Sequence, residues 1–334
     1  MDREPEELQF IGFFGVFQEA YKLVLSWRRI FSKIVLTLVL PLSLIFLFHI
    51  YISSILFAKI RRNEHALEYT PDGSAAEDRI LSRLASEWTA YLLFKGVYLL
   101  GVLIFALLST SAVVYSVACV YTAKDLTFPK VMAVVPKVWK RLMVTFLWTF
   151  LILLAYNTVT ILLAIALLVI TGTSTAGVVV LVLILLAYTV GLVYISVVWH
   201  LASVISVLED SCGIAAMRKS RVLIRGKLWL AIGIFLLLNL SFLAIEIAFK
   251  KLVAEGGRKG YGVGPRIGYG ALMLSLLCML ILLGLVIQTV IYFVCKSFHH
   301  ESIDKSSLAD HLEVYLGEYV PLRGKDVQME QYQV

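Results

Sequence analysis

Three ionisable side chains within long apolar runs of this sequence are candidates for chemistry: His49, Lys95 and Glu246. A titratable group within the hydrocarbon layer of a membrane is costly, so such groups mark solute pathways and proton relays. At a helical rise of about 1.5 Å per residue, His49 lies roughly 22 Å and Glu246 roughly 27 Å into their runs, and Lys95 lies near the outer start of its own. Together these residues would form one polar site in the outer half of a bilayer, suited to proton-coupled transport.

The same three side chains also have a structural interpretation. Lys95 and Glu246 are close enough to the ends of their runs to extend their charged groups toward water, and His49 needs one hydrogen bond to a neighbouring helix. Both interpretations stay open on the sequence alone. Other polar side chains within the runs are expected to link helices by hydrogen bonds. They are Asn157, Asn239, His200 and Gln288.

The composition indicates that membrane helices hold these residues. The chain has 334 residues, of which 60% are hydrophobic and 16% charged, and its mean hydropathy is +0.87. Soluble domains have about 45–50% apolar and about 25% charged residues. A helix needs about 20 mostly apolar residues to cross roughly 30 Å of hydrocarbon. Six runs meet that requirement, at 34–56, 91–120, 142–171, 177–207, 228–250 and 271–294.

These runs are continuously apolar instead of alternating, which favours helices over the strands of a barrel. The predicted fold is therefore an all-α polytopic membrane protein. Residues 1–33 are expected to form a cytosolic amphipathic segment, 34–294 the six-span membrane domain, and 295–334 a cytosolic tail. No cleavable signal peptide is expected, because the first apolar run is too long and too far from the start. The tail sequence SLADHLEVYLGEY predicts a short helix for a cytosolic protein partner.

The distribution of Lys and Arg predicts the orientation, because basic residues accumulate in cytoplasmic loops. The connection TGTSTAG, between the third and fourth runs, contains none, whereas the connections before and after it contain five each. Basic residues also precede the first run. With six spans, both termini are then expected in the cytosol. The expected location is an endomembrane of the secretory pathway or the plasma membrane.

A basic segment that contains aromatic residues precedes three of the six runs. The three segments are FFGVFQEAYKLVLSWRRIFSKI, LTFPKVMAVVPKVWKRL and SCGIAAMRKSRVLIRGKLWL. Their helical spacing separates basic residues from an apolar face, which in the second segment is formed by Val131, Val134, Val135 and Val138. Such helices lie in the membrane interface, with the apolar face in the acyl chains and the basic face toward anionic headgroups. Near an anionic surface each Lys or Arg contributes about 1 kcal/mol.

We therefore expect three repeats, each an interfacial helix followed by a transmembrane hairpin. The alternative is that the basic residues only follow the rule of positive charge on the cytoplasmic side. The residues expected to contact anionic lipid are Lys22, Arg28, Arg29, Lys33, Lys130, Lys137, Lys140, Arg141, Arg218, Arg221, Arg225 and Lys227.

The third segment, in GIAAMRKSRVLIRGKLWLAIGIF, resembles proteins related to the membrane domain of glycerophosphoryl diester phosphodiesterases. In that family an Ala-rich basic helix leads through a Gly–basic–Trp turn into a span. The whole chain, including the tail HLEVYLGEYVPLRGKDVQMEQYQV, resembles a plant family of multi-pass membrane proteins, some labelled polyadenylate-binding protein-binding protein. The catalytic barrel of the phosphodiesterases has no counterpart in this sequence. The resemblance therefore implies the membrane architecture and no phosphodiesterase activity.

The sequence contains no spacing typical of a nucleophile with its base or of a metal site, so no enzyme activity, catalytic residue, cofactor or metal is predicted. The glycines of EGGRKGYGVGPRIGYG lack the spacing of a phosphate-binding loop and predict a flexible external connector. The leading expectation is a membrane organiser, trafficking or scaffold protein. It would bind anionic lipids of the cytosolic leaflet and a cytosolic partner, with no direct contact to nucleic acid. The alternative is a small-solute or lipid transporter that uses His49, Lys95 and Glu246.

Overall fold

The computed structural model describes residues 10–71, 73–122, 126–172, 174–257 and 260–299. These described residues form helices and their connections, with no strand among them. Six of the helical stretches are long and apolar enough to cross a membrane, one for each run predicted from the sequence. The prediction of an all-α protein with six spans is therefore confirmed. The predicted partner-binding helix of the tail lies outside the described residues.

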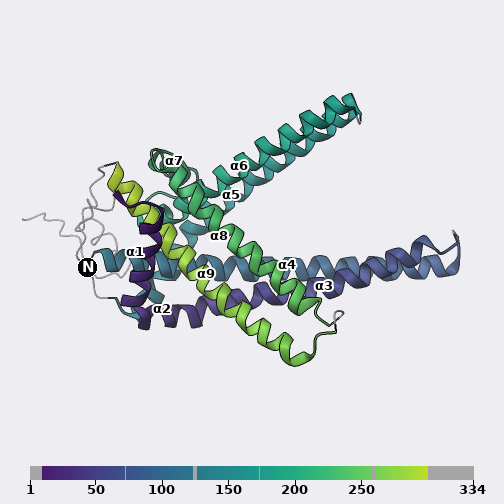
Figure 1. Cartoon of the computed structure of the whole chain (residues 1–334), viewed down its shortest axis with the longest axis horizontal. Helices are drawn as coiled ribbons and strands as arrows, with labels where there is room; N and C mark the ends of the chain where they lie inside the picture. The colour runs from purple at the N-terminus through teal and green to yellow at the C-terminus, as the bar shows by residue number, and fades with distance from the viewer. Residues whose placement is uncertain (1–9, 72, 123–125, 173, 258–259, 300–334) are drawn as a thin grey trace, which may run out of the picture.

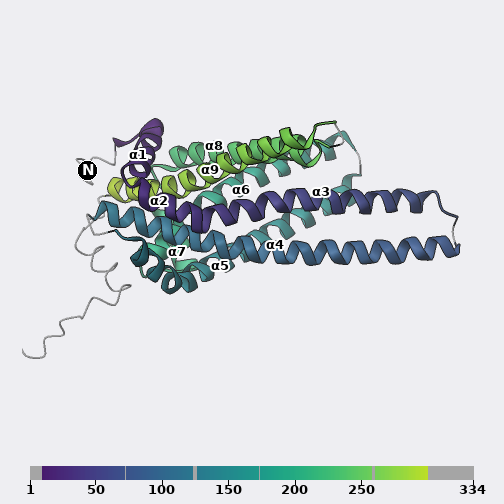
Figure 2. The same cartoon turned by 90° about the horizontal axis from the view of Figure 1, so that it is seen from below.

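The six spans form three antiparallel hairpins. In the first, α3 (Leu40–Glu68) returns as α4 (Ala75–Tyr121). In the second, α5 (Phe128–Thr171) returns as α6 (Thr175–Leu208), and in the third, α8 (Leu228–Phe249) returns as α9 (Val263–Phe298). Figure 1 and Figure 2 show the turns of all three hairpins at one end of the bundle, opposite the N-terminus. We call this the hairpin end.

Three short helices lie at the opposite end, near the N-terminus (Figure 1). They are α1 (Phe13–Ser26), α2 (Arg28–Ile34) and α7 (Ile214–Leu223). Together with the first turns of α5 they carry the three basic segments, so we call this the basic end. The second basic segment is not a separate helix, because α5 runs without interruption through Pro136 into its span. The arrangement of a basic segment followed by a hairpin still occurs three times.

Two stretches of π-helix adjoin spans. Val35–Val39 joins α2 to α3 just before Pro41, and Lys250–Ala254 extends α8 toward its turn. Beyond that turn, α9 begins at Val263, so the glycine-rich segment predicted as a flexible connector is helical from there onward. The Arg266 Nε group also donates to the Val253 carbonyl oxygen at 3.1 Å, which ties the two sides of the turn together.

The first hairpin extends far beyond the other two (Figure 2). Helix α4 has 47 residues, which corresponds to about 70 Å at 1.5 Å per residue, more than twice the hydrocarbon thickness of roughly 30 Å. The additional turns contain the charged residues between 59 and 87. There Asn63 Nδ2 on α3 donates to Glu87 Oε2 on α4 at 2.8 Å. The connection between the first two apolar runs is thus itself a charged helical hairpin.

The protein core lies at the basic end. Large side chains such as Phe31, Leu201 and Tyr292 are almost completely buried where the short helices meet the ends of the long ones. Toward the hairpin end the α5–α6 hairpin diverges from the α3–α4 hairpin (Figure 1), and its apolar side chains are exposed, Val169 by 79% and Ile170 by 82%. Exposed apolar side chains of this kind suit contact with lipid tails, while the buried end fixes the helices relative to one another.

Two of the predicted polar links between helices form. His200 Nδ1 on α6 lies 3.0 Å from Gln288 Oε1 on α9. The Tyr188 hydroxyl on α6 donates to Asn157 Oδ1 on α5 at 2.6 Å. Asn239 instead donates from Nδ2 to a carbonyl of its own helix at 2.8 Å. The first two contacts join neighbouring spans inside the apolar layer, where such bonds typically contribute about 0.6 kcal/mol each.

Candidate functional site

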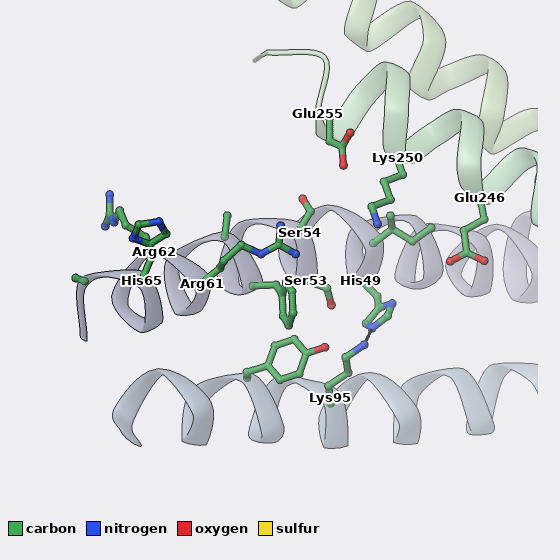
Figure 3. Close-up of a pocket in the computed structure, with 15 residues that line it drawn as sticks. His49, Ser53, Ser54, Arg61, Arg62, His65, Lys95, Glu246, Lys250 and Glu255 are labelled. Carbon is green, nitrogen blue, oxygen red and sulfur yellow. Dashed lines mark hydrogen bonds between the residues drawn. The ribbon is translucent and has the colours of Figure 1, made fainter. Parts of the chain in front are cut away.

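A pocket of about 740 Å³ lies between α3, α4 and the end of α8, in the half of the bundle toward the hairpin end (Figure 3). All three intramembrane ionisable residues predicted from the sequence line it. Lys95 Nζ on α4 lies 2.7 Å from His49 Nε2 on α3, and Glu246 reaches toward α3 from α8. The structure therefore brings His49 and Lys95 into direct contact and places Glu246 in the same pocket.

Aromatic side chains of α4 hold the two contacting residues. The His49 ring stacks on Tyr98 with ring centres 3.6 Å apart and lies parallel to Phe94 at 5.9 Å. The Lys95 Nζ atom lies 5.3 Å from the centre of the Tyr91 ring. Residues three and four apart share one face of a helix, so these aromatic residues form one surface against α3. That surface orients the imidazole toward the ammonium group.

The pocket lining also includes ionisable residues that were not assigned to a site from the sequence. Arg61, Arg62 and His65 come from the second half of α3, and Lys250 and Glu255 come from the end of the α8 hairpin arm. They reach the pocket because α3 remains helical beyond its apolar run, while the π-helical stretch extends α8. Figure 3 shows Lys250 and Glu255 approaching α3 from the α8 arm, whereas the His49–Lys95 contact lies between α3 and α4.

A sequence signal for this extension exists in the spacing along α3. Five lining residues follow one another at intervals of four, which places each one next to the following one on the helix surface. They are His49, Ser53, Phe57, Arg61 and His65. The polar and cationic members of this series continue past the end of the apolar run at residue 56. If the helix had been expected to continue beyond that residue, the whole series could have been assigned to the site.

The basic end gathers the residues predicted to contact lipid. Helix α1 buries one face, which includes Val16, and exposes the other, where Phe14 and Tyr21 accompany Lys22. Arg28 and Arg29 at the start of α2 are also exposed. An exposed face with aromatic and cationic side chains is typical of a helix that lies in a membrane interface.

Helix α7 has a similar division. It buries Ala216 and exposes Arg218 and Arg221, and the exposed side continues through Arg225 to Trp229, which is 84% exposed. Tryptophan is enriched at membrane–water interfaces because its ring is largely apolar and its N–H is polar. The exposed side of α7 therefore has the chemistry expected for an anionic membrane surface.

Two of the residues predicted to contact lipid also contact aromatic rings of the protein. Lys33 Nζ lies 6.0 Å from the ring centre of Phe128. Lys227 Nζ lies 5.2 Å from that of Phe298. These contacts give both lysines a role in packing beside the predicted lipid contact.

The second basic segment differs from its predicted arrangement. Its valine face does not lie in acyl chains, because all four valines are at most 2% exposed and pack into the core. They are Val131, Val134, Val135 and Val138. The prediction of a lipid-facing apolar surface is therefore wrong for this segment. Its basic face remains: Lys137 and Lys140 are exposed, and Lys130 is partly exposed.

Arg141, at the end of this segment, has partners within the protein. One guanidinium nitrogen donates to the Glu209 carbonyl oxygen at 2.5 Å, and another lies 3.3 Å from Asp210 Oδ1. The side chain thus fastens the start of the third span to the end of α6. This internal role was not apparent from the sequence, and the lipid contact of Arg141 stays a prediction.

Glu209 is the centre of a cluster that the sequence analysis missed. Its side chain is 13% exposed, and its Oε2 atom lies 2.7 Å from Lys219 Nζ. The other carboxylate oxygen, Oε1, accepts a hydrogen bond from the Tyr292 hydroxyl at 2.7 Å and lies 3.8 Å from Lys296 Nζ. The available signal was an acidic residue at the end of a span, in an otherwise basic connection. We call these residues the Glu209 cluster.

The chain matches, over residues 1–332, a sequence family described as a domain of unknown function (DUF8558). No curated protein and no solved structure matches the chain. The resemblance to plant multi-pass proteins and to the phosphodiesterase membrane domain stays a prediction. Arguments about function therefore depend on the geometry of the two ends of the bundle.

Proposed function

Because this chain belongs to the family described as a domain of unknown function (DUF8558), we propose its function from geometry: it is a non-enzymatic membrane organiser whose basic end binds anionic lipids. The observation that supports this proposal is the convergence of the three basic segments. Helices α1, α2 and α7 and the start of α5 lie together at one end (Figure 1, Figure 2), although long hairpins separate them in the sequence.

The proposed lipid-binding surface consists of the exposed cations of these segments. They are Lys22, Arg28, Arg29, Lys137, Lys140, Arg218, Arg221 and Arg225. Each contributes about 1 kcal/mol of attraction to an anionic leaflet. The attraction falls with ionic strength because exposed charges are screened over roughly 8 Å in physiological salt. Exposed aromatic residues such as Phe14 and Trp229 supply the apolar part of the interfacial contact.

Lipid retention by the full-length protein tests the proposal. The triple variant Arg218→Gln, Arg221→Gln, Arg225→Gln removes three exposed charges from the basic end. Native mass spectrometry of protein purified from mixed vesicles of phosphatidylserine and phosphatidylcholine then counts the retained lipids. We expect retained phosphatidylserine to fall on the order of tenfold or more, since about 1 kcal/mol is lost per charge.

A matched control removes three exposed charges at the hairpin end, by Lys59→Gln, Arg79→Gln and Arg83→Gln. These side chains are exposed and do not line the polar pocket. The control should retain phosphatidylserine like the wild type. Equal retention by both triple variants would contradict a specific role for the basic end.

The proposed orientation places the basic end and both termini in the cytosol, facing the anionic leaflet of an endomembrane or the plasma membrane. The C-terminal tail would then meet a cytosolic protein partner. Two introduced tags test the orientation, one in the α5–α6 turn and one after Val334. Selective permeabilisation of the plasma membrane should expose the tail tag to antibody. The turn tag should already be accessible in intact cells if the protein lies in the plasma membrane, and should remain inaccessible after selective permeabilisation if it lies in an endomembrane. Simultaneous appearance of both tags would contradict this orientation.

Transport of a small solute or lipid is the second candidate function. The polar pocket favours it, because His49, Lys95 and Glu246 meet there within the membrane-spanning helices. The test is movement of a fluorescent phospholipid between the leaflets of proteoliposomes, together with uptake of radiolabelled glycerol 3-phosphate. Glu246→Gln should abolish one of these activities in a protein that still purifies as a folded species. Activity equal to that of the wild type would exclude this site from transport.

A further inference from the structure

The polar pocket has more cationic than acidic residues in its lining. The cations are Arg61, Arg62, Lys95 and Lys250, and the carboxylates are Glu246 and Glu255. Within the part of the chain that the structure describes, no ion pair within 4 Å joins any of these six side chains to another. A concave site with surplus charge of one sign, bounded by walls of low dielectric constant, concentrates ions of the opposite sign.

Two buried polar atoms of the pocket have no hydrogen-bond partner among the described residues. They are His49 Nδ1 and Ser53 Oγ. An ammonium group can only donate, so the 2.7 Å contact with Lys95 makes His49 Nε2 an acceptor and leaves the ring hydrogen on Nδ1. Buried donors almost always have partners in folded proteins. These two atoms therefore indicate an acceptor that comes from outside the chain.

The side chains that can donate to a ligand in the pocket come from three helices. His49, Ser53 and Arg61 belong to α3, Lys95 to α4 and Lys250 to the π-helical extension of α8. A single ligand group must present several acceptor oxygens in different directions to engage all of them. Phosphate does so, because its oxygens are arranged tetrahedrally and accept charge-assisted hydrogen bonds from Lys and Arg. A carboxylate presents two oxygens in one plane and can satisfy fewer of these donors.

From this donor arrangement we propose that the polar pocket binds a phosphate group carried by a phospholipid headgroup or by a soluble phosphate ester. The proposal names the ligand class of the site considered for transport and does not depend on lipid binding at the basic end.

The depth of the pocket favours the lipid as the source of the phosphate. Lys250 stands at the end of its apolar run, whereas His49 lies well inside another run, so the pocket extends from the membrane edge into the apolar layer. Ile50, Phe57 and Ala58 also line it. These side chains offer an apolar surface to the part of a lipid that follows its headgroup.

The test uses the full-length protein in a neutral detergent and measures the affinity for three probes. Dihexanoyl phosphatidic acid carries phosphate and tails, dihexanoylglycerol carries the tails alone, and glycerol 3-phosphate carries the phosphate alone. We expect dihexanoyl phosphatidic acid to bind at least tenfold more tightly than dihexanoylglycerol. Comparable affinities for these two probes would overturn the proposal, because the phosphate group would then contribute nothing.

Paired variants locate the site. Lys95→Gln with Lys250→Gln removes two pocket cations, and Lys59→Gln with Arg79→Gln removes two exposed cations outside the pocket. The pocket pair should weaken binding of dihexanoyl phosphatidic acid by tenfold or more, since charge-assisted hydrogen bonds are lost, and the control pair should leave it unchanged. Equal effects of the two pairs would overturn the proposal.

The soluble probe distinguishes the two sources of phosphate. If glycerol 3-phosphate binds with the same dependence on the pocket pair, the ligand is a soluble phosphate ester; if only the lipid binds, the source is the headgroup. Ser53→Ala is the second variant if the pocket pair fails to fold. It removes one unpartnered hydroxyl and should weaken phosphatidic acid binding about threefold. Full affinity of Ser53→Ala would overturn the role assigned to that hydroxyl and, with it, the donor arrangement on which the proposal depends.

Discussion

The Glu209 cluster and the polar pocket use similar residues in opposite ways. In the cluster both carboxylate oxygens of Glu209 have partners, Lys219 on Oε2 and Tyr292 on Oε1. In the pocket the cations have no carboxylate partner among the described residues, and two donors lack acceptors around a volume of about 740 Å³. The two groups therefore differ in whether their charges are paired. Paired charges fasten helices to one another, whereas unpaired charges around a cavity are available to a ligand.

The surroundings of the two groups agree with this difference. The Glu209 cluster joins the end of α6 to α7 and α9 beside the buried core. The polar pocket lies between α3, α4 and the end of α8, and the hairpins that contain these helices extend away from that core (Figure 1). Substitution of a charged residue in the Glu209 cluster should therefore lower the stability of the protein. Substitution of a cation in the polar pocket should instead weaken ligand binding.

The largest expected effect on stability comes from Glu209→Gln. The substitution removes the charge that compensates Lys219 and Lys296, and breaking a largely buried ion pair costs about 3 kcal/mol. The thermal unfolding midpoint in detergent should fall markedly. Asp210→Asn is the control, because the Asp210 side chain is 86% exposed and an exposed pair contributes at most about 1 kcal/mol. Equal midpoints for the two variants would contradict the assigned role of Glu209.

Gly213→Ala should have the next largest effect. Gly213 precedes α7 with a φ of 62°, which disfavours other residues, and an added Cβ would lie 2.9 Å from Trp148 Cδ1. We expect a loss of about 2 kcal/mol from strain in this backbone region and the close contact. Gly268→Ala is the control, since it lies in α9 with open space around its Cβ position. The control should keep or raise the unfolding midpoint, and a fall as large as that of Gly213→Ala would refute the steric argument.

Tyr292→Phe tests the hydrogen bond to Glu209 more selectively. The ring stays in the core while the hydroxyl is lost, so we expect a loss of about 1.5 kcal/mol, typical of a bond to a charged group. Tyr69→Phe serves as the control, because Tyr69 is 75% exposed on the first hairpin. Chemical unfolding followed by Trp fluorescence compares the two. No difference between them would show that the hydroxyl does not stabilise the Glu209 cluster.

The smallest expected change in stability comes from the pocket pair Lys95→Gln with Lys250→Gln. Neither cation has an ion-pair partner among the described residues, and Lys95 contacts only His49 and the Tyr91 ring in the contacts described above, so we expect a loss of at most about 1 kcal/mol without ligand. A loss as large as that of Glu209→Gln would show that the pocket, too, is a stabilising cluster.

The spans could be predicted from the sequence because a membrane helix must be continuously apolar for about 20 residues. The meeting of His49, Lys95 and Glu246 was also predictable, since helical rise alone places them at similar depth. The charged part of the first hairpin was not predicted, because its helices lie beyond the apolar layer. A search for continuous apolar runs does not find helices that are rich in charged residues. Arg61 was missed at the pocket for the same reason.

The Glu209 cluster could not be predicted because its partners are distant in the sequence. Tyr292 is separated from Glu209 by 83 residues, and nothing in the local pattern links the two. The buried valine face of α5 was misjudged for a related reason. A helix face of valines suits either lipid tails or a protein core, and the choice depends on whether other helices cover it. Here the core at the basic end covers Val131 and Val138 completely.

The most direct test of the account measures unfolding midpoints of the wild type, Glu209→Gln and the pocket pair, each with and without dihexanoyl phosphatidic acid. A ligand that binds the folded protein raises its midpoint. We expect Glu209→Gln to lower the starting midpoint but to keep the ligand-induced rise. We expect the pocket pair to change the starting midpoint little and to lose the rise. A rise that disappears in Glu209→Gln and persists in the pocket pair would contradict the division of roles between the two clusters.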